Sequence, residues 1–498
     1  MKTAKVNIAL LFLFSVTENM QHTAAIPSKT TNSKNSSIAI IGAGVAGLAA
    51  ASRLIELGFT DVTIFEAQDR IGGRVFPVPF ESGYLQMGAE YINGRNNPIY
   101  KIAQSLNILD KEENDAMDSY DPLKDATFYS GNCALAQSSI DKFLKFIAPL
   151  EKKFTKRATE GDEADKAESI GHLYGEEYKK FAAEHAKLPK DKDVYDAMSH
   201  FYQAYYYEAE WAADWNDLSL INFAQDNCSD PVDPVQIMNK QGYKAVLDHI
   251  SANIPSSSIK LNSRVASIDY SGSGVRINLT SGPQKKQFQK VIVTVSLGHL
   301  KKFAKTMFYP SLPQAKQKAI DKLGFGAIGK LFLVYKKPWW DPEMTSLVTV
   351  AVENCANSTA ADKLFHTFEL IPWNKNVLLG WLSGPGPAAI DAMSDNKVST
   401  TVTSLFRRML KNGTIPAPTK IFRNQWTTNP LFGGTYSYIS VAAAKTGLSL
   451  NDQLAAPIVV DGVARVLFAG EATHEDVYAT VIGAYSSGRR EAERLAKN

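Results

Sequence analysis

The segment Ser37–Glu66 constrains the fold more than any other part of the chain. It contains a short apolar run, three closely spaced glycines, a helical stretch and a second apolar run that ends in an acid. The β-branched run Ile38–Ile41 is typical of a buried parallel strand, and Val62–Phe65 is expected to lie beside it. Between them the pattern predicts a helix over Val45–Leu57, which ends at Gly58. This order favours a dinucleotide-binding unit over an isolated glycine turn.

Each glycine of this unit has a separate physical task. Gly42 permits the tight turn from strand to helix, and Gly44 lets a pyrophosphate approach the backbone. Gly47 allows the helix to lie close to the sheet. Glu66, at the end of the second strand, suits the 2′ and 3′ hydroxyls of an adenosine ribose. These residues predict that the chain binds an adenine dinucleotide.

A loop rich in glycine and arginine follows almost at once. Gly72 and Gly73 remove side chains where the backbone must approach a cofactor, and Arg70 and Arg74 supply donors for phosphates or a flavin ring. A polar loop with an ordinary Gly-Gly turn is the alternative interpretation. With its RxGGR signature after the ribose acid, the sequence resembles the FAD-dependent amine oxidase superfamily. The resemblance implies FAD as the cofactor.

The same resemblance implies an α/β fold with two interleaved domains. A Rossmann-type FAD-binding domain with a parallel sheet is expected to alternate with a mixed α+β substrate-binding domain, and 498 residues suffice for both. The motifs assign residues 37–95, 240–302 and 456–498 to the FAD-binding domain. The substrate-binding domain is then expected in residues 96–239 and 303–455.

Further segments resemble the cofactor contacts of this superfamily. The glutamate of a Phe-Ala-Gly-Glu strand end could accept hydrogen bonds from the ribityl hydroxyls. A helix that begins after the next loop offers free backbone donors to a flavin carbonyl or a phosphate. Together these segments add eight candidate cofactor contacts: Gly88, Ala89, Glu90, Val265, Gly470, Glu471, Thr480 and Val481.

Lys330 is the best catalytic candidate in the sequence. It stands at the head of an apolar strand, where a charge is costly unless it lies at the strand edge or has a partner. A strand-end lysine that extends to water is the alternative. The segment resembles the superfamily's lysine strand, whose side chain binds a water beside flavin N5. The resemblance therefore implies a catalytic role for Lys330.

The chain ends in a GAxxSGxREA motif, formed by Gly483, Ala484, Ser487, Gly488, Arg490, Glu491 and Ala492. This ending is similar to the C-terminus of animal spermine and acetylpolyamine oxidases. That likeness implies carboxylates and aromatic walls for a flexible polycation. Glu210 matches an acidic channel residue, Tyr436 an aromatic wall and Thr480 the opposite wall, although Glu210 and Tyr436 also suit an exposed helix and a packed core. Asn93 departs from the pattern, because polyamine oxidases carry His or Glu there; Glu90 is a candidate to compensate as a substrate-binding residue.

The resemblance implies oxidation of a secondary amine of a polyamine by O2, giving an aldehyde, a shorter amine and hydrogen peroxide. The segment Gly433–Ser437 resembles the superfamily's segment beside the flavin, near which monoamine oxidases carry a flavin-linking cysteine. It contains no cysteine, so the resemblance implies that FAD is held without a covalent bond. Two alternatives stay open. One is a secreted L-amino-acid oxidase, which needs an arginine for the substrate carboxylate, and the other is a non-catalytic FAD-binding protein, which Asn93 suggests.

The N-terminus reads as a secretory signal peptide over residues 1–26, with a buried helix as the alternative. Its apolar run is too short to span a membrane, and five N-x-S/T sequons fit secretion to the extracellular space. The net charge of only +3 does not suggest a nucleic-acid partner. Three cysteines allow at most one disulfide, and no metal-site spacing occurs.

Overall fold

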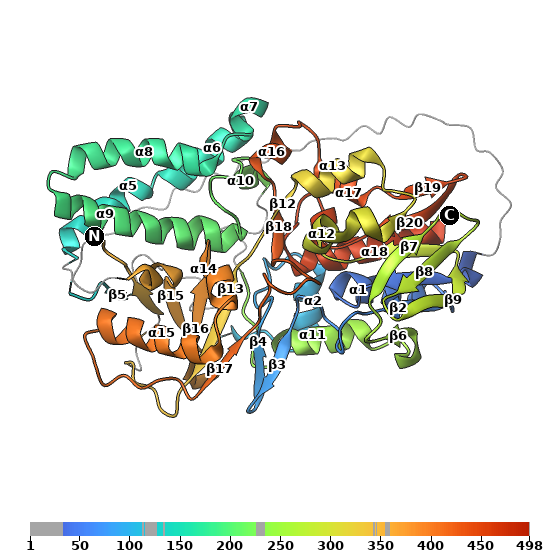
Figure 1. Cartoon of the computed structure of the whole chain (residues 1–498), viewed down its shortest axis with the longest axis horizontal. Coiled ribbons are helices and arrows are strands. Elements are labelled where there is room, and N and C mark those ends of the chain that lie inside the picture. The colour runs from blue at the N-terminus through green and yellow to red at the C-terminus, as the bar shows by residue number, and fades with distance from the viewer. Residues whose placement is uncertain are drawn as a thin grey trace.

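Two six-stranded sheets organise the chain, one in each half of the molecule (Figure 1). The structure is a computed structural model. It describes residues 33–497 except 112–113, 115–126, 133–134, 226–234, 342–343, 345 and 354–358. The predicted signal peptide, the three cysteines and the sequons at Asn227 and Asn357 lie outside the described residues.

The first sheet is the predicted parallel sheet. Five of its strands run parallel, and β19 is added antiparallel at one edge. Every strand falls within the three segments expected to form the FAD-binding domain. The order across the sheet is β19 (Ile458–Val460), β20 (Val463–Phe468), β10 (Lys290–Val293), β1 (Ile38–Ile41), β2 (Val62–Phe65) and β6 (Ile259–Lys260).

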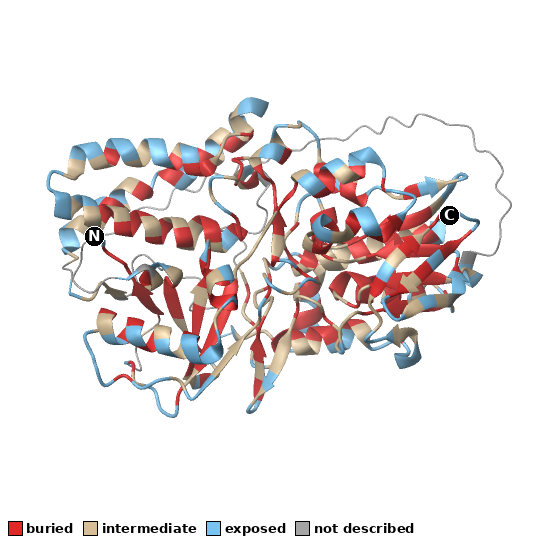
Figure 2. Cartoon of the chain, viewed as in Figure 1, coloured by how far each residue is buried: buried red, intermediate tan, exposed pale blue. Residues whose placement is uncertain are grey.

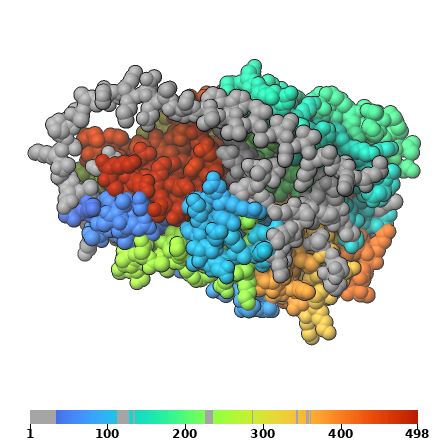
Figure 3. All heavy atoms as spheres, turned by 180° about the vertical axis from the view of Figure 1, so that it is seen from behind, coloured from blue at the N-terminus to red at the C-terminus, as the bar shows by residue number. Residues whose placement is uncertain are grey.

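Helices from both ends of the sequence pack beside this sheet. α1 (Val45–Glu56) lies against α18 (Val481–Lys497) and α11 (Gly242–Ser251). In Figure 3 the blue N-terminal elements accordingly lie next to the red C-terminal ones. A Cβ atom at Gly488 would lie 2.1 Å from the carbonyl oxygen of Ala46, so glycine is required for this close helix contact. The segments are thus distant in sequence but form one domain.

A smaller sheet extends this half of the molecule. It contains β11 (Phe308–Tyr309), β7 (Val265–Asp269), β8 (Val275–Leu279) and β9 (Gly282–Phe288), in that order. β9 consists mainly of polar residues, which lack the clear apolar alternation of a typical strand. β11 lies beyond residue 302, the boundary expected for the FAD-binding domain.

The second large sheet is mainly antiparallel and belongs to the predicted substrate-binding segments. Helix α15 (Asp395–Met409) covers one face, and its outer surface is exposed (Figure 2). The opposite face packs against the hairpin β3 (Pro77–Phe80) and β4 (Gly83–Gln86). The strand order is β17 (Lys420–Arg423), β13 (Gly329–Val334), β16 (Asn374–Leu382), β15 (Thr367–Ile371), β14 (Ser346–Thr349) and β5 (Thr127–Tyr129).

A group of helices rich in aromatic contacts lies beyond one end of this sheet (Figure 1). They are α5 (Gln137–Ile147), α6 (Leu150–Glu160), α7 (Glu163–Lys166), α8 (Ile170–His185), α9 (Pro189–Tyr202) and the π-helix η2 (Gln203–Ala209). Among the described residues, no helix combines the length and apolar character needed to cross a bilayer.

Shorter elements join these parts. The helices are α2 (Pro98–Ser105), α10 (Asn222–Gln225), α12 (Leu297–Met307), α13 (Gln314–Lys322), α14 (Gly386–Asp391), α16 (Val441–Ala444) and α17 (Leu450–Ala455). The strands β12 (Gly324–Gly326) and β18 (Tyr436–Tyr438) pair where the two halves meet.

Candidate active site

One large cavity connects the two halves of the molecule. Its volume of about 1410 Å³ exceeds the roughly 300–1,000 Å³ of an ordinary small-molecule pocket. The glycine-rich unit after β1 lines one part, and the antiparallel sheet lines another. The space is therefore large enough for a dinucleotide and a second molecule.

The glycines after β1 form an open cradle at one end of this cavity. Gly42 has φ +108°, and a Cβ atom at Gly47 would lie 2.0 Å from the carbonyl oxygen of Gly42. A Cβ at Gly44, in contrast, would project into nearly open space. Gly72 approaches this turn from the following loop, where its N–H donates to the carbonyl of Ala43 at 2.8 Å.

Glu66 lies beside this cradle, as expected for the ribose acid. Its carboxylate is buried and accepts hydrogen bonds from the N–H groups of Ala43 at 2.7 Å and Gln68 at 2.8 Å. Burial raises the pKa of Glu66, while these two donors oppose the shift. The side-chain oxygen of Gln68 is buried without a hydrogen-bond partner and also lines the cavity. Both groups can bind hydroxyls of a ligand.

The two arginines of the RxGGR signature have different positions. Arg70 donates to the carbonyls of Ile71 and Gly73, and its guanidinium lies over the ring of Phe76. Arg70 therefore stabilises the loop. It is not among the cavity-lining residues, so the direct cofactor contact that we predicted for it is wrong. Arg74 does line the cavity.

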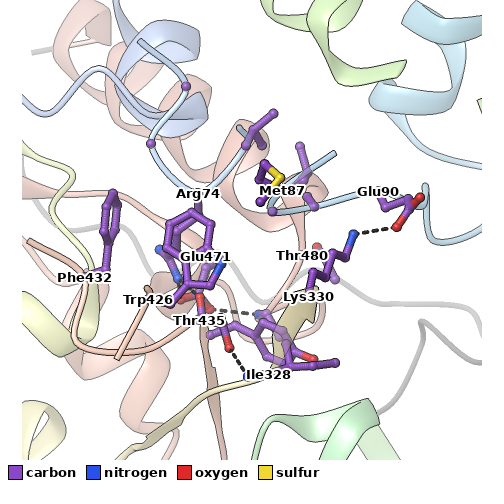
Figure 4. A pocket seen from close by; sticks show the side chains of 18 of the residues that line it. Arg74, Met87, Glu90, Ile328, Lys330, Trp426, Phe432, Thr435, Glu471 and Thr480 are labelled. Carbon is purple, nitrogen blue, oxygen red and sulfur yellow. Dashed lines mark hydrogen bonds and ion pairs between the residues drawn. The ribbon is translucent and has the colours of Figure 1, made fainter. Parts of the chain in front are cut away.

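Glu471 joins three segments at the centre of the site (Figure 4). It accepts hydrogen bonds from Arg74 at 2.8 Å, Ser437 at 2.6 Å and the N–H of Ala479 at 2.9 Å. The preceding residue, Gly470, has φ +136°, and a Cβ there would meet no atom within 4 Å. The ordered carboxylate thus borders open space at the start of α18.

These features fit a bound FAD. The open positions at Gly44 and Gly470 are places where a side chain would fill the cavity, and Gln68 offers an unpaired acceptor. This part of the lining is completed by Gly73, Gly88, Ala89, Val265, Thr480 and Val481. Gly73 also lies close to the backbone of Gly44, since a Cβ atom on it would be 3.3 Å from the Gly44 Cα. The residues present can therefore hold the dinucleotide, its phosphates and its ring.

Lys330 points into the same cavity from β13 and has an acidic partner. Its Nζ donates to Glu90 at 2.5 Å (Figure 4). It also donates to the carbonyl of Gln86 at 3.1 Å. Nζ also lies 4.8 Å from the centre of the Trp381 ring. Burial lowers the pKa of Lys330, and Glu90 opposes the shift. The alternative of a lysine extending to bulk water does not apply, since its side chain is only 7% exposed.

The strand register explains why these groups meet. Lys330 on β13 pairs with Trp381 on β16, which pairs with Thr367 on β15, so all three point to one face of the sheet. Glu369, two residues beyond Thr367, shares that face and accepts a hydrogen bond from Trp381 Nε1 at 2.9 Å. Sequence reasoning missed both Trp381 and Glu369. A glutamate within the apolar run Thr367–Ile371 was the available signal.

The predicted substrate residues lie around the rest of this space. Glu210 follows the π-helix η2 and is exposed at the cavity edge. The hydroxyl of Tyr436 donates to the carbonyls of Ala209 at 2.9 Å and Glu210 at 3.2 Å, which fixes the ring against this helix end. Asn93 and Thr480 also line the cavity.

Comparison with known proteins identifies the family. The profile described as "Flavin containing amine oxidoreductase" matches residues 45–496. The chain belongs to this family. It is therefore a flavin-dependent amine oxidase, and FAD is its cofactor, as the motifs predicted. The match begins within the glycine-rich unit, after Gly44, and includes the RxGGR loop and the lysine strand.

Relatives and solved structures agree with this assignment. Over 488 residues the chain is 28% identical to human peroxisomal N(1)-acetyl-spermine/spermidine oxidase, covering 92% of this chain and 94% of the relative. It is also 28% identical to probable polyamine oxidase 5 of Arabidopsis thaliana, over 93% and 99% of the two chains. A putrescine oxidase bound to putrescine shares the fold, with a TM-score of 0.64, 15% identity and coverage of 93% and 99%.

The flavin-dependent amine oxidase brings nearly all its predicted site residues to one cavity. Gly47 and Arg70 are the exceptions, since they support the turn and the loop from outside the lining. No cysteine lies among the described residues of the lining, and non-covalent attachment of FAD stays a prediction. His366, which sequence reasoning also missed, lines the cavity with its Nε2 buried and unpartnered; burial lowers its pKa to about 3.

Proposed function

We propose that this flavin-dependent amine oxidase oxidises a secondary amine of a polyamine, such as spermine or an acetylated derivative. The main support is the charge on the substrate side of the cavity. Glu90, Glu210 and Glu369 line it, whereas the lysines among its described lining residues are Lys330, already paired, and the exposed Lys375. Carboxylates beside aromatic rings suit a flexible polycation.

FAD, when bound, would supply the redox chemistry, a two-electron oxidation of the amine at the carbon next to nitrogen with O2 as the final acceptor, which is reduced to hydrogen peroxide. The protein's own residues bind and orient the amine in a space shielded from bulk water. Lys330 is placed to hold a water molecule inside the cavity by a hydrogen bond from its ammonium group. The imine product hydrolyses in water to an aldehyde and a shorter amine.

An L-amino-acid oxidase is less well supported by the lining residues. Such an enzyme needs an arginine for the substrate carboxylate, and the described arginines of the lining are Arg74 and Arg264. Arg74 is paired with Glu471, and Arg264 lies next to Val265, over the ring of Phe303. Neither belongs to the sheet face that carries Lys330.

A substrate panel tests the proposal. Peroxide release is measured with spermine, N-acetylated spermine, putrescine and a set of L-amino acids, using purified protein that retains flavin absorbance. We expect turnover with a polyamine and none with L-amino acids. Turnover restricted to L-amino acids would contradict the proposal. A flavin-loaded protein inactive on every amine would instead support the non-catalytic alternative suggested by Asn93.

We also propose that the enzyme is secreted. The apolar segment before residue 26 and the sequons support this proposal; Asn35 and Asn412 are exposed, whereas Asn278 lies within β8 and donates to Ser267 at 2.9 Å. Expression of the full-length chain in a eukaryotic secretion host, followed by N-terminal sequencing and glycosidase treatment of the medium, tests it. Protein that stays in cells with residues 1–26 intact would contradict secretion.

A further inference from the structure

Glu369 is a carboxylate of the cavity that the sequence motifs do not include among the site residues. It lies in the middle of β15 (Thr367–Ile371), a strand whose other residues are apolar or hydroxylated. The register places its side chain on the face of the sheet that carries Lys330 and Trp381. It lines the cavity rather than the core under α15.

The hydrogen bonding of Glu369 is incomplete. Trp381 Nε1 donates to one carboxylate oxygen at 2.9 Å. Within the part of the chain that the structure describes, no lysine, arginine or histidine lies within salt-bridge distance of Glu369. The nearby lysine, Lys330, is already paired with Glu90 at 2.5 Å. One oxygen of Glu369 is thus oriented by the indole, and the other has capacity for a further donor.

The charge balance of this group points to a cationic ligand. Among the described residues, two carboxylates, Glu90 and Glu369, face a single ammonium, that of Lys330. An ionised carboxylate that is half-buried, as Glu369 is, is costly unless it gains a partner. In agreement, burial raises the pKa of Glu369 to about 7; Trp381 and Lys330 lower it, and Glu90 raises it. A cation that entered the cavity would restore the balance.

We infer that Glu369, oriented by the indole N–H of Trp381, binds an ammonium group of the substrate inside the cavity. This inference rests on the proposed amine substrate and adds a second recognition point to the expected one at Glu210. A charged ammonium donates a strong hydrogen bond to a carboxylate. Glu369 is therefore a specificity residue and Trp381 a positioning residue.

The first test compares Glu369→Gln with Glu184→Gln, a control whose side chain is 77% exposed on α8. Flavin absorbance verifies cofactor loading in each variant. Steady-state kinetics with the best polyamine and inhibition by a linear terminal diamine and its monoamine analogue are then measured. We expect roughly a tenfold or greater rise in KM and in the diamine inhibition constant for Glu369→Gln only, with a smaller change for the monoamine. Unchanged constants would overturn the inference.

The second test uses pH and keeps the inference falsifiable if Glu369→Gln loses flavin. Besides Trp381, the groups that face Glu369 are Lys330 from β13 and Glu90 from the loop after β4, while Tyr91 stacks on the Trp381 ring. Because a carboxylic acid must lose its proton to bind an ammonium, diamine affinity should fall as pH drops below about 7, approaching tenfold per pH unit. Glu369→Gln should abolish this acid limb.

Trp381→Phe should shift the pH at which diamine affinity falls. Removal of the indole N–H takes away a bond that lowers the pKa of Glu369, so the loss of affinity should begin at higher pH. A purely structural role for Trp381 would change affinity equally at every pH. A limb that stays in place in both variants would overturn the inference. If the wild-type enzyme oxidises no amine but its diamine affinity falls at acid pH, the proposed function fails and the cation site stands. If it oxidises polyamines normally but its diamine affinity does not depend on pH in this way, the cation site fails and the proposed function stands.

Discussion

The two sheets that border the cavity solve different problems with different residues. The parallel sheet is apolar on both faces, and its ligand contacts come from glycines and backbone groups at the strand ends, as at Gly44. The antiparallel sheet is apolar on the face under α15, but carries Lys330, Trp381 and Glu369 on the other. Cofactor binding thus depends on space for the ligand, and substrate binding on charged side chains.

This difference predicts how the two regions respond to mutation. Filling space near α1 should remove the cofactor altogether. Changing a charge on the antiparallel sheet should alter rates or affinities while FAD stays bound. The four substitutions below test this contrast, beginning with the largest expected effect.

Gly47→Ala should abolish FAD binding. Its Cβ would lie 2.0 Å from the carbonyl oxygen of Gly42, which is backbone and cannot move without displacing α1 from β1. Gly175→Ala is the matched control, because a Cβ at this helical position meets no atom within 4 Å. Flavin absorbance of the purified variants measures the effect. Full flavin content in Gly47→Ala would show that the close approach is unnecessary.

Glu471→Ala should destabilise the folded protein by roughly 3 kcal/mol, since it leaves Arg74 without its buried partner and frees two further donors. Glu56→Ala is the control, because Glu56 forms a partly exposed pair with Arg53 that is worth about 1 kcal/mol or less. Urea unfolding of both variants, followed by fluorescence, compares them. Equal midpoints would contradict the central role of Glu471.

Lys330→Met should slow flavin reduction or reoxidation by about 10²-fold, while FAD stays bound. Methionine keeps much of the length but loses the ammonium that contacts Glu90 and the Gln86 carbonyl. Lys336→Met, at an exposed position close in sequence, serves as the control. Anaerobic stopped-flow reduction and reoxidation by O2 are measured separately. If both rates match wild type, Lys330 has no part in the mechanism.

Glu210→Gln should have the smallest effect, a rise in the KM for a polycation of a few-fold, because this carboxylate is exposed at the cavity edge and water screens its charge. Glu208→Gln is the matched control from the same helical segment, because Glu208 is buried, bonds to Gln203 and does not line the cavity. Initial rates against spermine concentration give both constants. A fall in kcat with constant KM would exclude a pure recognition role.

The sequence predicted the cofactor half of the site more completely than the substrate half. The spacing of the glycines between two strands defines a strand–turn–helix geometry that depends only on residues close in sequence. Gly42, Gly44 and Glu66 could therefore be placed without the structure. Lys330 could be flagged because a charge in an apolar strand needs a partner. Its partner Glu90, 240 residues away in the chain, could not be inferred, because no local pattern links the two.

The sequence by itself determined the dinucleotide unit, the family and an unusual lysine, since each rests on residues adjacent in the chain. Only the tertiary structure decided which charges meet. The pairing of β13, β16 and β15 sets Lys330, Trp381 and Glu369 on one face, and the return of the chain after β4 brings Glu90 to them. Strand register acts across tens of residues, and a shift of one residue would turn all three side chains into the opposite core.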